Sequence, residues 1–511
     1  MNDDGRVNLT NADAAFESLT NGQPTLVWHK VIADTETPVG AAAKLMEDGR
    51  GDFLLESVEG GEVRGRYSLL GLAPDLVFRA SADRAEINRV WASDRGAFDV
   101  CDIGTLPALR ALVAECHIDV PLGLPPALSV LVGYFGYETI GLVEKLSDPA
   151  QSPLDLPDML FVRPTMLLVF DKLTEELFAI APIWHADGNA AATLDLASRR
   201  IHRALAELNQ AVPATSKGKR LAGGDVGGDI EHAITRADYA AMVGRAKEYI
   251  AAGDVFQVVL AQRFSTPFSL PPFALYRALR RVNPSPFLYF LDMPGFALVG
   301  SSPEILVRVR DGEVTVRPIA GTRPRGHDEA ADARTRAELL ADPKERAEHL
   351  MLLDLGRNDV GRVAERGSVA VTDSFGVEKY SHVMHIVSNV TGTLASSYDA
   401  IDALFAGFPA GTVSGAPKVR ACQIIGELEP EARGAYAGGV GYFAPDGSID
   451  SCIVLRTGVV QDGTLHVQAG AGIVADSNAA YEQRECEAKA GALFAAAEEA
   501  IRIAQLSEYI Q

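Results

Sequence analysis

Residues 305–317 read Ile305-Leu-Val-Arg-Val-Arg-Asp-Gly-Glu-Val-Thr-Val-Arg317, and this stretch decides the fold class. Apolar and polar side chains alternate on both sides of Asp311-Gly312, as they do in strands with one buried face. An Asp-Gly pair between two such runs is typical of a tight turn that joins antiparallel strands. The stretch therefore predicts a hairpin. The same pair recurs between apolar runs at Asp462-Gly463 and at Asp446-Gly447.

A helix is predicted shortly before these hairpins. Thr235, followed by Asp238 three residues later, has the pattern of a capping box, which opens a helix. Apolar residues follow at helical spacing from Tyr239 to Ile250, and Gly253 is a typical helix end. The sequence shows neither strict strand–helix alternation nor a glycine-rich dinucleotide motif. Because hairpins are mixed with helices, we expect an α+β fold with antiparallel sheets.

The chain has 511 residues, of which 47% are hydrophobic, so it can bury a large core. Residues 209–231 mix Gly, Pro, Ser and charged residues without periodicity, which indicates an exposed linker. We therefore expect an N-terminal domain over residues 1–230 and a second domain over residues 232–511.

Composition disfavours several classes of protein. No apolar run approaches the roughly 20 residues that a membrane-spanning helix requires. The start of the chain is polar and acidic, unlike a signal peptide, so we expect a soluble cytoplasmic protein. The net charge of −21 disfavours nucleic acid as a partner. A disulfide framework and a zinc site are disfavoured because no paired spacing links Cys101, Cys116, Cys422, Cys452 and Cys486.

Two pairs of glutamates are candidate metal ligands. Glu345 and Glu348 lie three residues apart in a helix-like segment, and so do Glu482 and Glu485. This spacing puts both carboxylates of a pair on one helical face, where all four could meet across a cleft. Such oxygens suit Mg2+, which keeps several waters and bridges to an anionic substrate. The same pairs are also typical of a solvated helix surface, and the spacing alone leaves both interpretations open.

Three longer motifs identify a family. They follow one another over about residues 240–500 and read Asp354-Leu-Gly-Arg-Asn-Asp359, Phe408-Pro-Ala-Gly-Thr-Val-Ser-Gly-Ala-Pro-Lys418 and Gln468-Ala-Gly-Ala-Gly-Ile-Val474. With the glutamates after them, these motifs resemble the chorismate-utilising enzymes. Within that superfamily, Leu54-Leu-Glu-Ser57 and Asn283-Pro-Ser-Pro286 resemble the anthranilate synthase component I family. The resemblance implies antiparallel sheets packed as a sandwich with helices outside, and a lyase that makes anthranilate and pyruvate for tryptophan synthesis.

The resemblance implies a magnesium cofactor. Glu348 and Glu485 match the family's magnesium ligands, and Glu345 and Glu482 match the carboxylates behind them. Displacing the ring hydroxyl of chorismate, a dianion, with ammonia requires a Lewis acid, which holds the ring carboxylate and draws off charge.

The resemblance also implies catalytic residues. Glu304 matches the carboxylate beside the departing hydroxyl, where a general acid belongs. His385 matches the histidine of the second half-reaction, which eliminates pyruvate from the aminated ring. Thr412 lies in the second of the three motifs and is a further catalytic candidate.

Substrate contacts follow from the same resemblance. Arg456 and Tyr436 match groups that hold the enolpyruvyl carboxylate. Backbone N–H groups of a glycine-containing turn can point at an anion because no side chain blocks the approach. The remaining candidates are Gly470, Ala471 and Gly472 as amide donors, Gly321 and Thr322 at the ring carboxylate, and Lys489 as a charge that balances the glutamates.

Two positions separate members of the superfamily. Aminodeoxychorismate synthases typically carry a nucleophilic lysine in a Pro-Ile-x-Gly-Thr motif, where this chain has Ala320. Isochorismate and salicylate synthases carry a lysine base where this chain has Gln257. Ammonia is already a nucleophile and needs neither amine, so both positions favour anthranilate synthase. Aminodeoxychorismate synthase component I and a catalytically silent, tryptophan-sensing subunit are the alternatives.

Regulation and a partner are implied as well. The N-terminal domain would contribute a pocket for tryptophan, a feedback inhibitor, and residues 232–511 would form the chorismate-binding catalytic domain. None of the cysteines has the glycine-flanked setting of a glutamine-cleaving nucleophile. We therefore expect a hetero-oligomer, in which a glutamine amidotransferase subunit supplies ammonia. The expected tryptophan pocket consists of Leu55, Glu56, Ser57, Asn283, Pro284, Ser285, Pro286 and Phe287.

Overall fold

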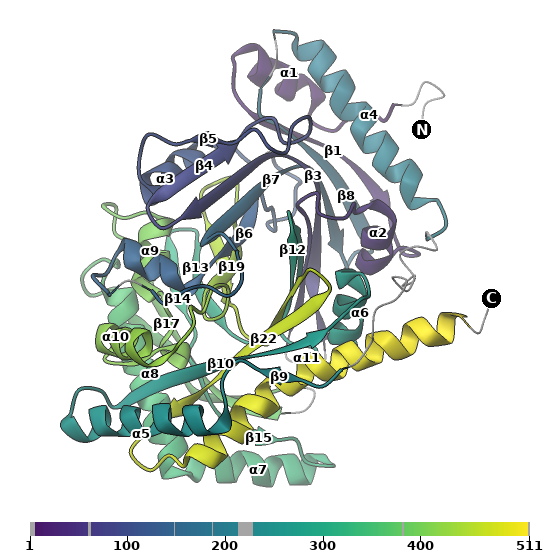
Figure 1. Ribbon diagram of the computed structural model, residues 1–511. Coiled ribbons are helices and arrows are strands. Elements are labelled where there is room, and N and C mark those ends of the chain that lie inside the picture. Colours follow the sequence, from purple (N-terminus) through teal and green to yellow (C-terminus); the bar gives the residue numbers. More distant parts are fainter. Residues whose placement is uncertain are drawn as a thin grey trace.

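The computed structural model describes residues 6–59, 63–147, 149–185, 188–212, 228–380 and 383–508 (Figure 1). Before residue 212 its helices are α1 (Ala12–Thr20), α2 (Pro38–Leu45), α3 (Thr105–Glu115), the 3-10 helix η1 (Tyr137–Leu142) and α4 (Ala190–Leu208). After residue 228 they are α5 (Arg236–Ala252), α6 (Pro272–Val282), α7 (Glu329–Ala341), α8 (Pro343–Gly361), α9 (Ala400–Gly407), the 3-10 helix η3 (Gly411–Val413), α10 (Lys418–Leu428) and α11 (Ala479–Glu508).

Strands fall in both parts of the chain. The first part holds β1 (Thr25–Ile32), β2 (Asp52–Glu59), β3 (Val63–Ser81), β4 (Arg84–Asn88), β5 (Asp99–Val100), β6 (Leu131–Phe135), β7 (Met159–Asp171) and β8 (Glu176–Ile183). The second holds β9 (Glu231–His232), β10 (Gln257–Pro267), β11 (Phe287–Met293), β12 (Phe296–Ser302), β13 (Ile305–Arg310), β14 (Glu313–Val316), β15 (Ile319–Pro324), β16 (Ala370–Lys379), β17 (Val383–Thr393), β18 (Gly415–Ala416), β19 (Gly439–Phe443), β20 (Ile449–Ile453), β21 (Thr457–Gln461) and β22 (Thr464–Ile473).

Two sheets diverge from the long paired strands β3 and β7, and every strand pair in the described residues is antiparallel. β3 bends at Ala73, whose φ is +50°, and its register against β7 shifts between Pro74 and Leu76. One sheet continues from β3 through β2, β11, β12, β21 and β22 to β10. The other continues from β7 through β6, β19, β20, β13 and β14 to β17, which also pairs with β15 and β16.

The expected α+β architecture is confirmed, and the Asp-Gly turns lie where the sequence predicts them. Asp311 and Gly312 have φ values of +52° and +72° and join β13 to β14. Asp462 and Gly463 join β21 to β22 with φ values of +49° and +74°. Positive φ at both central residues matches the right-handed twist of the flanking strands. The third pair lies in the turn between β19 and β20.

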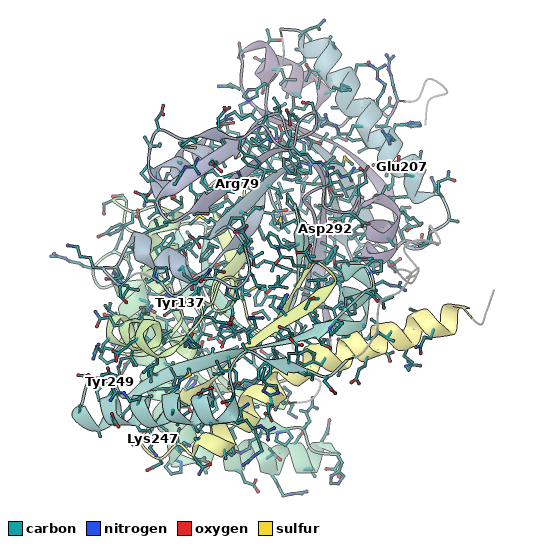
Figure 2. All side chains as sticks on the ribbon, viewed as in Figure 1. Arg79, Tyr137, Glu207, Lys247, Tyr249 and Asp292 are labelled. Atoms are coloured by element: carbon teal, nitrogen blue, oxygen red, sulfur yellow. The ribbon has the colours of Figure 1, made fainter. Side chains whose placement is uncertain are left out.

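Helices lie on the outside of the strands, and side chains fill the interior between them (Figures 1 and 2). α1 and α4 pack beside β1 and β8, whereas α6 and α11 pack against β12 and β22. α5 begins as predicted, because Thr235 and Asp238 form both bonds of the capping box. Gly253 ends this helix with a φ of +86°.

The two parts of the chain share both sheets. β2 pairs with β11 from Asp52 to Ser57, and β6 pairs with β19 along its whole length. The division into domains at residue 230 stays a prediction, and most of the expected linker, residues 213–227, lies outside the described residues. No described helix is both long and apolar enough to cross a membrane.

Candidate active site

A cavity of about 540 Å3 lies between the two sheets, with walls from β10 and β22 on one side and β15 and β17 on the other. Of the residues predicted for catalysis, substrate and metal, only Ala471 does not line this cavity. Ala471 is fully buried, because alternate residues of β22 face opposite sides of the sheet. Its role as an amide donor stays a prediction. The lining residues are Glu304, Gly321, Thr322, Glu345, Glu348, His385, Thr412, Tyr436, Arg456, Gly470, Gly472, Glu482, Glu485 and Lys489.

The four glutamates come from two helix starts. Glu345 and Glu348 lie in the first turns of α8, and Glu482 and Glu485 lie in the first turns of α11. Glu345 forms an ion pair with Arg323 at 2.7 Å, and Glu485 forms one with Lys489 at 2.8 Å. All four carboxylates lie at one cavity.

Glu348 and Glu482 form no ion pair with the described residues. Burial, reinforced by the negative charge of Glu345, raises the pKa of Glu348. Burial also raises the pKa of Glu482, with a contribution from Glu485. Within the described ranges, no three acidic, histidine or cysteine side chains lie close enough together to hold a metal ion. Carboxylate oxygens are the donor type that a hard cation takes, together with waters and oxygens of a substrate.

Glu304 is a buried carboxyl group with a raised pKa. Its side chain accepts hydrogen bonds from the Thr412 hydroxyl at 3.2 and 3.1 Å to the two carboxyl oxygens. Burial outweighs these bonds and raises the pKa of Glu304 to about 8. Glu304 is therefore protonated at neutral pH and can donate that proton, as a general acid must.

His385 on β17 is buried and neutral. Its Nδ1 lies 3.2 Å from the Gly321 carbonyl oxygen and 3.1 Å from the Thr322 hydroxyl. A carbonyl can only accept, so Nδ1 carries the proton in that bond and Nε2 is left as an acceptor. Burial, with the positive charge of Arg456, lowers the pKa of His385 to about 4. A neutral imidazole of this kind can take a proton from a substrate.

Arg456 supplies the cavity with positive charge. No carboxylate of the described residues pairs with its guanidinium, and burial lowers the pKa of this group. An arginine side chain is effectively always protonated in proteins. An unpaired guanidinium in a cavity binds a carboxylate well, because its planar donors match that group. The backbone of Arg456 has a φ of +47°, a left-handed conformation that is uncommon for a residue with a side chain.

The glycines of β22 pack closely against side chains of the cavity wall. A Cβ on Gly470 would lie 2.9 Å from the Tyr436 hydroxyl, and a Cβ on Gly472 would lie 2.5 Å from Nε2 of Gln257. Lys489 also donates to the Gly470 carbonyl at 2.8 Å. Larger residues would therefore displace Tyr436 and Gln257 from the cavity wall.

Comparison with known proteins agrees with this geometry. A sequence model of the chorismate binding enzymes matches residues 65–495. The chain belongs to this family. An anthranilate synthase component 1 of Cereibacter sphaeroides is 51% identical over 491 residues, which cover 95% of this chain and 98% of the relative. The Pseudomonas aeruginosa protein of the same name is 47% identical over 470 residues, covering 91% and 94% of the two chains.

Solved structures share the fold of this chain. The crystal structure of anthranilate synthase component I from Streptococcus pneumoniae superposes with a TM-score of 0.75 at 35% identity, covering 91% of this chain and 98% of that one. The menaquinone-specific isochorismate synthase of Escherichia coli superposes with a TM-score of 0.68 at 18% identity, covering 96% and 100%. The second likeness shows the fold alone.

Several residues of the cavity were not predicted from the sequence. Arg323 follows Thr322 on β15 and bonds Glu345 and Asp342, so it fixes the start of α8. β15 reads Ile-Ala-Gly-Thr-Arg-Pro, without apolar–polar alternation, so its sequence does not indicate which side chains face the cavity. The other unpredicted residues include Lys344, Gln468, Ser477 and Tyr481.

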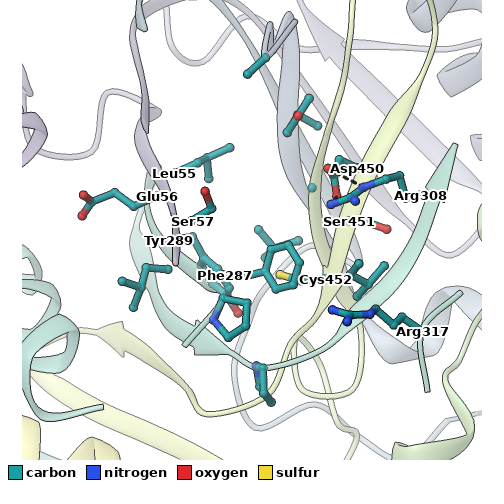
Figure 3. Close-up of a pocket in the computed structure, with 18 of the residues that line it drawn as sticks. Leu55, Glu56, Ser57, Phe287, Tyr289, Arg308, Arg317, Asp450, Ser451 and Cys452 are labelled. Carbon is teal, nitrogen blue, oxygen red and sulfur yellow. Dashed lines mark hydrogen bonds and ion pairs between the residues drawn. The ribbon is translucent and has the colours of Figure 1, made fainter. Parts of the chain in front are cut away.

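The predicted tryptophan residues divide between two further cavities. Leu55, Glu56, Ser57, Pro286 and Phe287 line a cavity of about 520 Å3 between β2 and β11 on one side and β13 and β20 on the other (Figure 3). Asn283, Pro284 and Ser285 instead line a cavity of about 250 Å3 beside His385 and Arg456. Segment 283–287 therefore reaches from the larger of these cavities to the smaller one, which shares His385 and Arg456 with the catalytic cavity.

Glu56 is engaged by neighbours from α6. Its carboxylate accepts from the Tyr276 hydroxyl at 2.7 Å and from the Arg280 guanidinium at 3.1 and 3.2 Å. The side chain is buried, and its carboxylate is already bonded to α6. Glu56 therefore holds the cavity wall in place.

Proposed function

We propose that this chain converts chorismate and ammonia to anthranilate and pyruvate, as the large subunit of a two-component anthranilate synthase in the cytoplasm. One observation carries the proposal: Glu304, His385 and the unpaired Arg456 line the same cavity as the four glutamates. The identity to relatives named anthranilate synthase component 1 supports it.

In the first half-reaction, ammonia adds to the ring of chorismate, the ring double bond shifts, and the ring hydroxyl departs. Protonated Glu304 gives its proton to that hydroxyl, which leaves as water. A magnesium ion held by Glu348 and Glu485 would bind the ring carboxylate and stabilise negative charge as the hydroxyl departs. Gly321 and Thr322 would place the ring carboxylate beside them.

In the second half-reaction, the aminated ring loses a proton and pyruvate and becomes aromatic. Neutral His385 takes the ring proton at Nε2, because Nδ1 is held by the Gly321 carbonyl. Arg456 would hold the enolpyruvyl carboxylate, with Tyr436 beside it. The electrons of the broken C–H bond complete the aromatic ring as the enolpyruvyl C–O bond breaks. The leaving group departs as the enolate of pyruvate, which takes a proton from the solvent to become pyruvate.

The alternatives lack support in the cavity. Ala320 and Gln257 both line it, so neither position offers an amine nucleophile or a lysine base. Lys489, which does line it, is paired with Glu485 and bonded to Gly470. A catalytically silent, tryptophan-sensing subunit would not need four glutamates and a neutral, buried His385 around the same cavity.

The pH dependence of turnover should show that Glu304 acts as a general acid. A general acid acts only when protonated, so the rate should hold below pH 8 and fall as the pH rises through the Glu304 pKa of about 8. The measurement is the rate at saturating chorismate with the concentration of free ammonia held constant. Glu304→Gln should be slow and should lack this decline. A parental rate that stays constant well above pH 8 would contradict the assignment.

Ammonia should come from a separate amidotransferase subunit. Burial raises the pKa of all five cysteine thiols, the wrong direction for a nucleophile, and no cysteine lines the catalytic cavity. The purified chain should therefore make anthranilate from ammonium salts and none from glutamine. Adding a glutamine amidotransferase component should restore glutamine use. Glutamine-dependent synthesis by the rigorously purified single chain would refute this part of the proposal.

Tryptophan should inhibit from the cavity of about 520 Å3, where Ser57 faces Phe287. Ser57→Phe would fill that space, so inhibition should be relieved while uninhibited turnover stays near the parental rate. Coupling between two sites usually changes affinity by roughly 5- to 150-fold, and Ser57→Phe should lose an effect of that size. Inhibition titrations measure it. Ser57→Ala, which keeps the space, should weaken inhibition only partly. If Ser57→Phe is inhibited at the parental tryptophan concentration, the ligand binds elsewhere.

A further inference from the structure

A buried ion pair lies behind the wall of the catalytic cavity without lining it. Arg433 and Glu429 have side-chain exposures of 1% and 4% and are joined by two bonds, from Nε at 2.8 Å and from Nη2 at 2.6 Å. Neither residue belongs to any of the sites proposed above. Removing both charges from water costs free energy, which is offset only if the pair has good geometry and further hydrogen bonds.

The pair ties two segments of the cavity wall together. Nη1 of Arg433 donates to the Val413 carbonyl at 2.7 Å, next to Thr412, whose hydroxyl bonds Glu304. Nη2 of Arg433 donates to the Val259 carbonyl at 2.9 Å, and Glu429 accepts from the Ala261 amide at 2.8 Å. Val259 and Ala261 of β10 are the register partners of Gly472 and Gly470 on β22.

A third segment is held by the backbone of Arg433. Glu138 accepts from the amides of Arg433 and Gly434 at 2.7 and 3.0 Å, and the Tyr436 amide donates to the Arg433 carbonyl at 3.2 Å. The guanidinium carbon lies 4.6 Å from the centre of the Tyr137 ring and 5.6 Å from that of Tyr436. Tyr137, labelled in Figure 2, packs against the pair from η1.

We propose that Arg433 and Glu429 are positioning residues, which set the Thr412 turn, the glycine strand β22 and Tyr436 at fixed places around the substrate. The proposal rests on the function proposed above. A planar guanidinium reaches the Val413 carbonyl, the Val259 carbonyl and a carboxylate at once, whereas an ammonium group on a flexible stem cannot span all three. Misplacement by about 1 Å can reduce turnover by about 10²-fold.

The test compares Arg433→Lys with Arg163→Lys. Arg163 is a matched control because its side chain is 4% exposed and bonds Asp75 and Glu115, each at 2.9 Å, and it lines none of the cavities described above. The melting temperature should fall by a similar amount in both variants. Arg433→Lys should also lower kcat by about 10²-fold with a smaller change in KM, whereas Arg163→Lys should keep the parental kcat. Equal kcat losses in the two variants would overturn the proposal.

Two further readouts separate positioning from general stability. The Thr412 bond lowers the pKa of Glu304, so releasing that turn should move the decline in rate to higher pH in Arg433→Lys alone. Amide hydrogen exchange should become faster in residues 259–261, 411–414 and 470–472 of Arg433→Lys and not of Arg163→Lys. Exchange needs no turnover, so it decides the positioning role even if the parent makes no anthranilate. Unchanged exchange in those segments would contradict the proposal.

Discussion

Glu348→Gln should reduce anthranilate formation by about 10³-fold or more, because a Lewis acid supplies several kcal/mol of charge stabilisation and each 1.36 kcal/mol is tenfold in rate. The amide keeps the shape of the side chain but lacks the charge that would hold magnesium. The measurement is turnover with chorismate, ammonium and a series of magnesium concentrations. The apparent magnesium affinity should fall together with the rate.

Stability should not fall with activity in this variant. Burial and Glu345 raise the pKa of Glu348, so above that pKa its ionised form destabilises the folded state. The melting temperature of Glu348→Gln should therefore hold or rise. Glu498→Gln is the control, since Glu498 is exposed on α11. Parental turnover by Glu348→Gln would remove Glu348 from the metal site.

His385→Ala should accumulate aminodeoxyisochorismate, because amination proceeds and elimination of pyruvate is slowed. General acid–base help contributes typically 10² to 10⁴-fold, so the second half-reaction should slow by about that factor. Chromatography of the products, sampled over time with chorismate and ammonium, measures both half-reactions in one experiment. The aminated intermediate should appear before any anthranilate.

A second buried histidine provides the control for this prediction. His349 on α8 also has a pKa lowered by burial to about 4, and it bonds the Ser388 hydroxyl at 2.6 Å, but it does not line the cavity. His349→Gln should give anthranilate without accumulation of the intermediate. Equal loss of amination and elimination in His385→Ala would show that His385 serves binding or folding and not the second step.

Local features of the fold were predictable because local chemistry determines them. Asp311-Gly312 and Asp462-Gly463 favour positive φ, and both turns join neighbouring antiparallel strands. The capping box at Thr235 likewise needs only the next three residues. Pairing between distant strands has no such local signal. The β2–β11 and β6–β19 pairs, which join the two parts of the chain, could not be derived from alternation alone.

The candidate site shows the same limit. The resemblance to the family predicted the four glutamates, Glu304 and His385 as site residues. In the structure all of them line one cavity. Ala471 shows the limit of a motif, because consecutive residues of a strand face opposite sides. Arg433 and Glu429 carry no sequence signal of their role, since their bonds reach Val259 and Val413 through the tertiary fold.

The central claim is tested most directly by the products that the purified chain makes from chorismate, an ammonium salt and magnesium. Chromatography with standards of anthranilate, pyruvate, aminodeoxychorismate and isochorismate identifies them. We expect anthranilate and pyruvate in equal amounts, with nitrogen from labelled ammonium in the anthranilate. Aminodeoxychorismate or isochorismate as the final product, or unreacted chorismate under these conditions, would contradict the account.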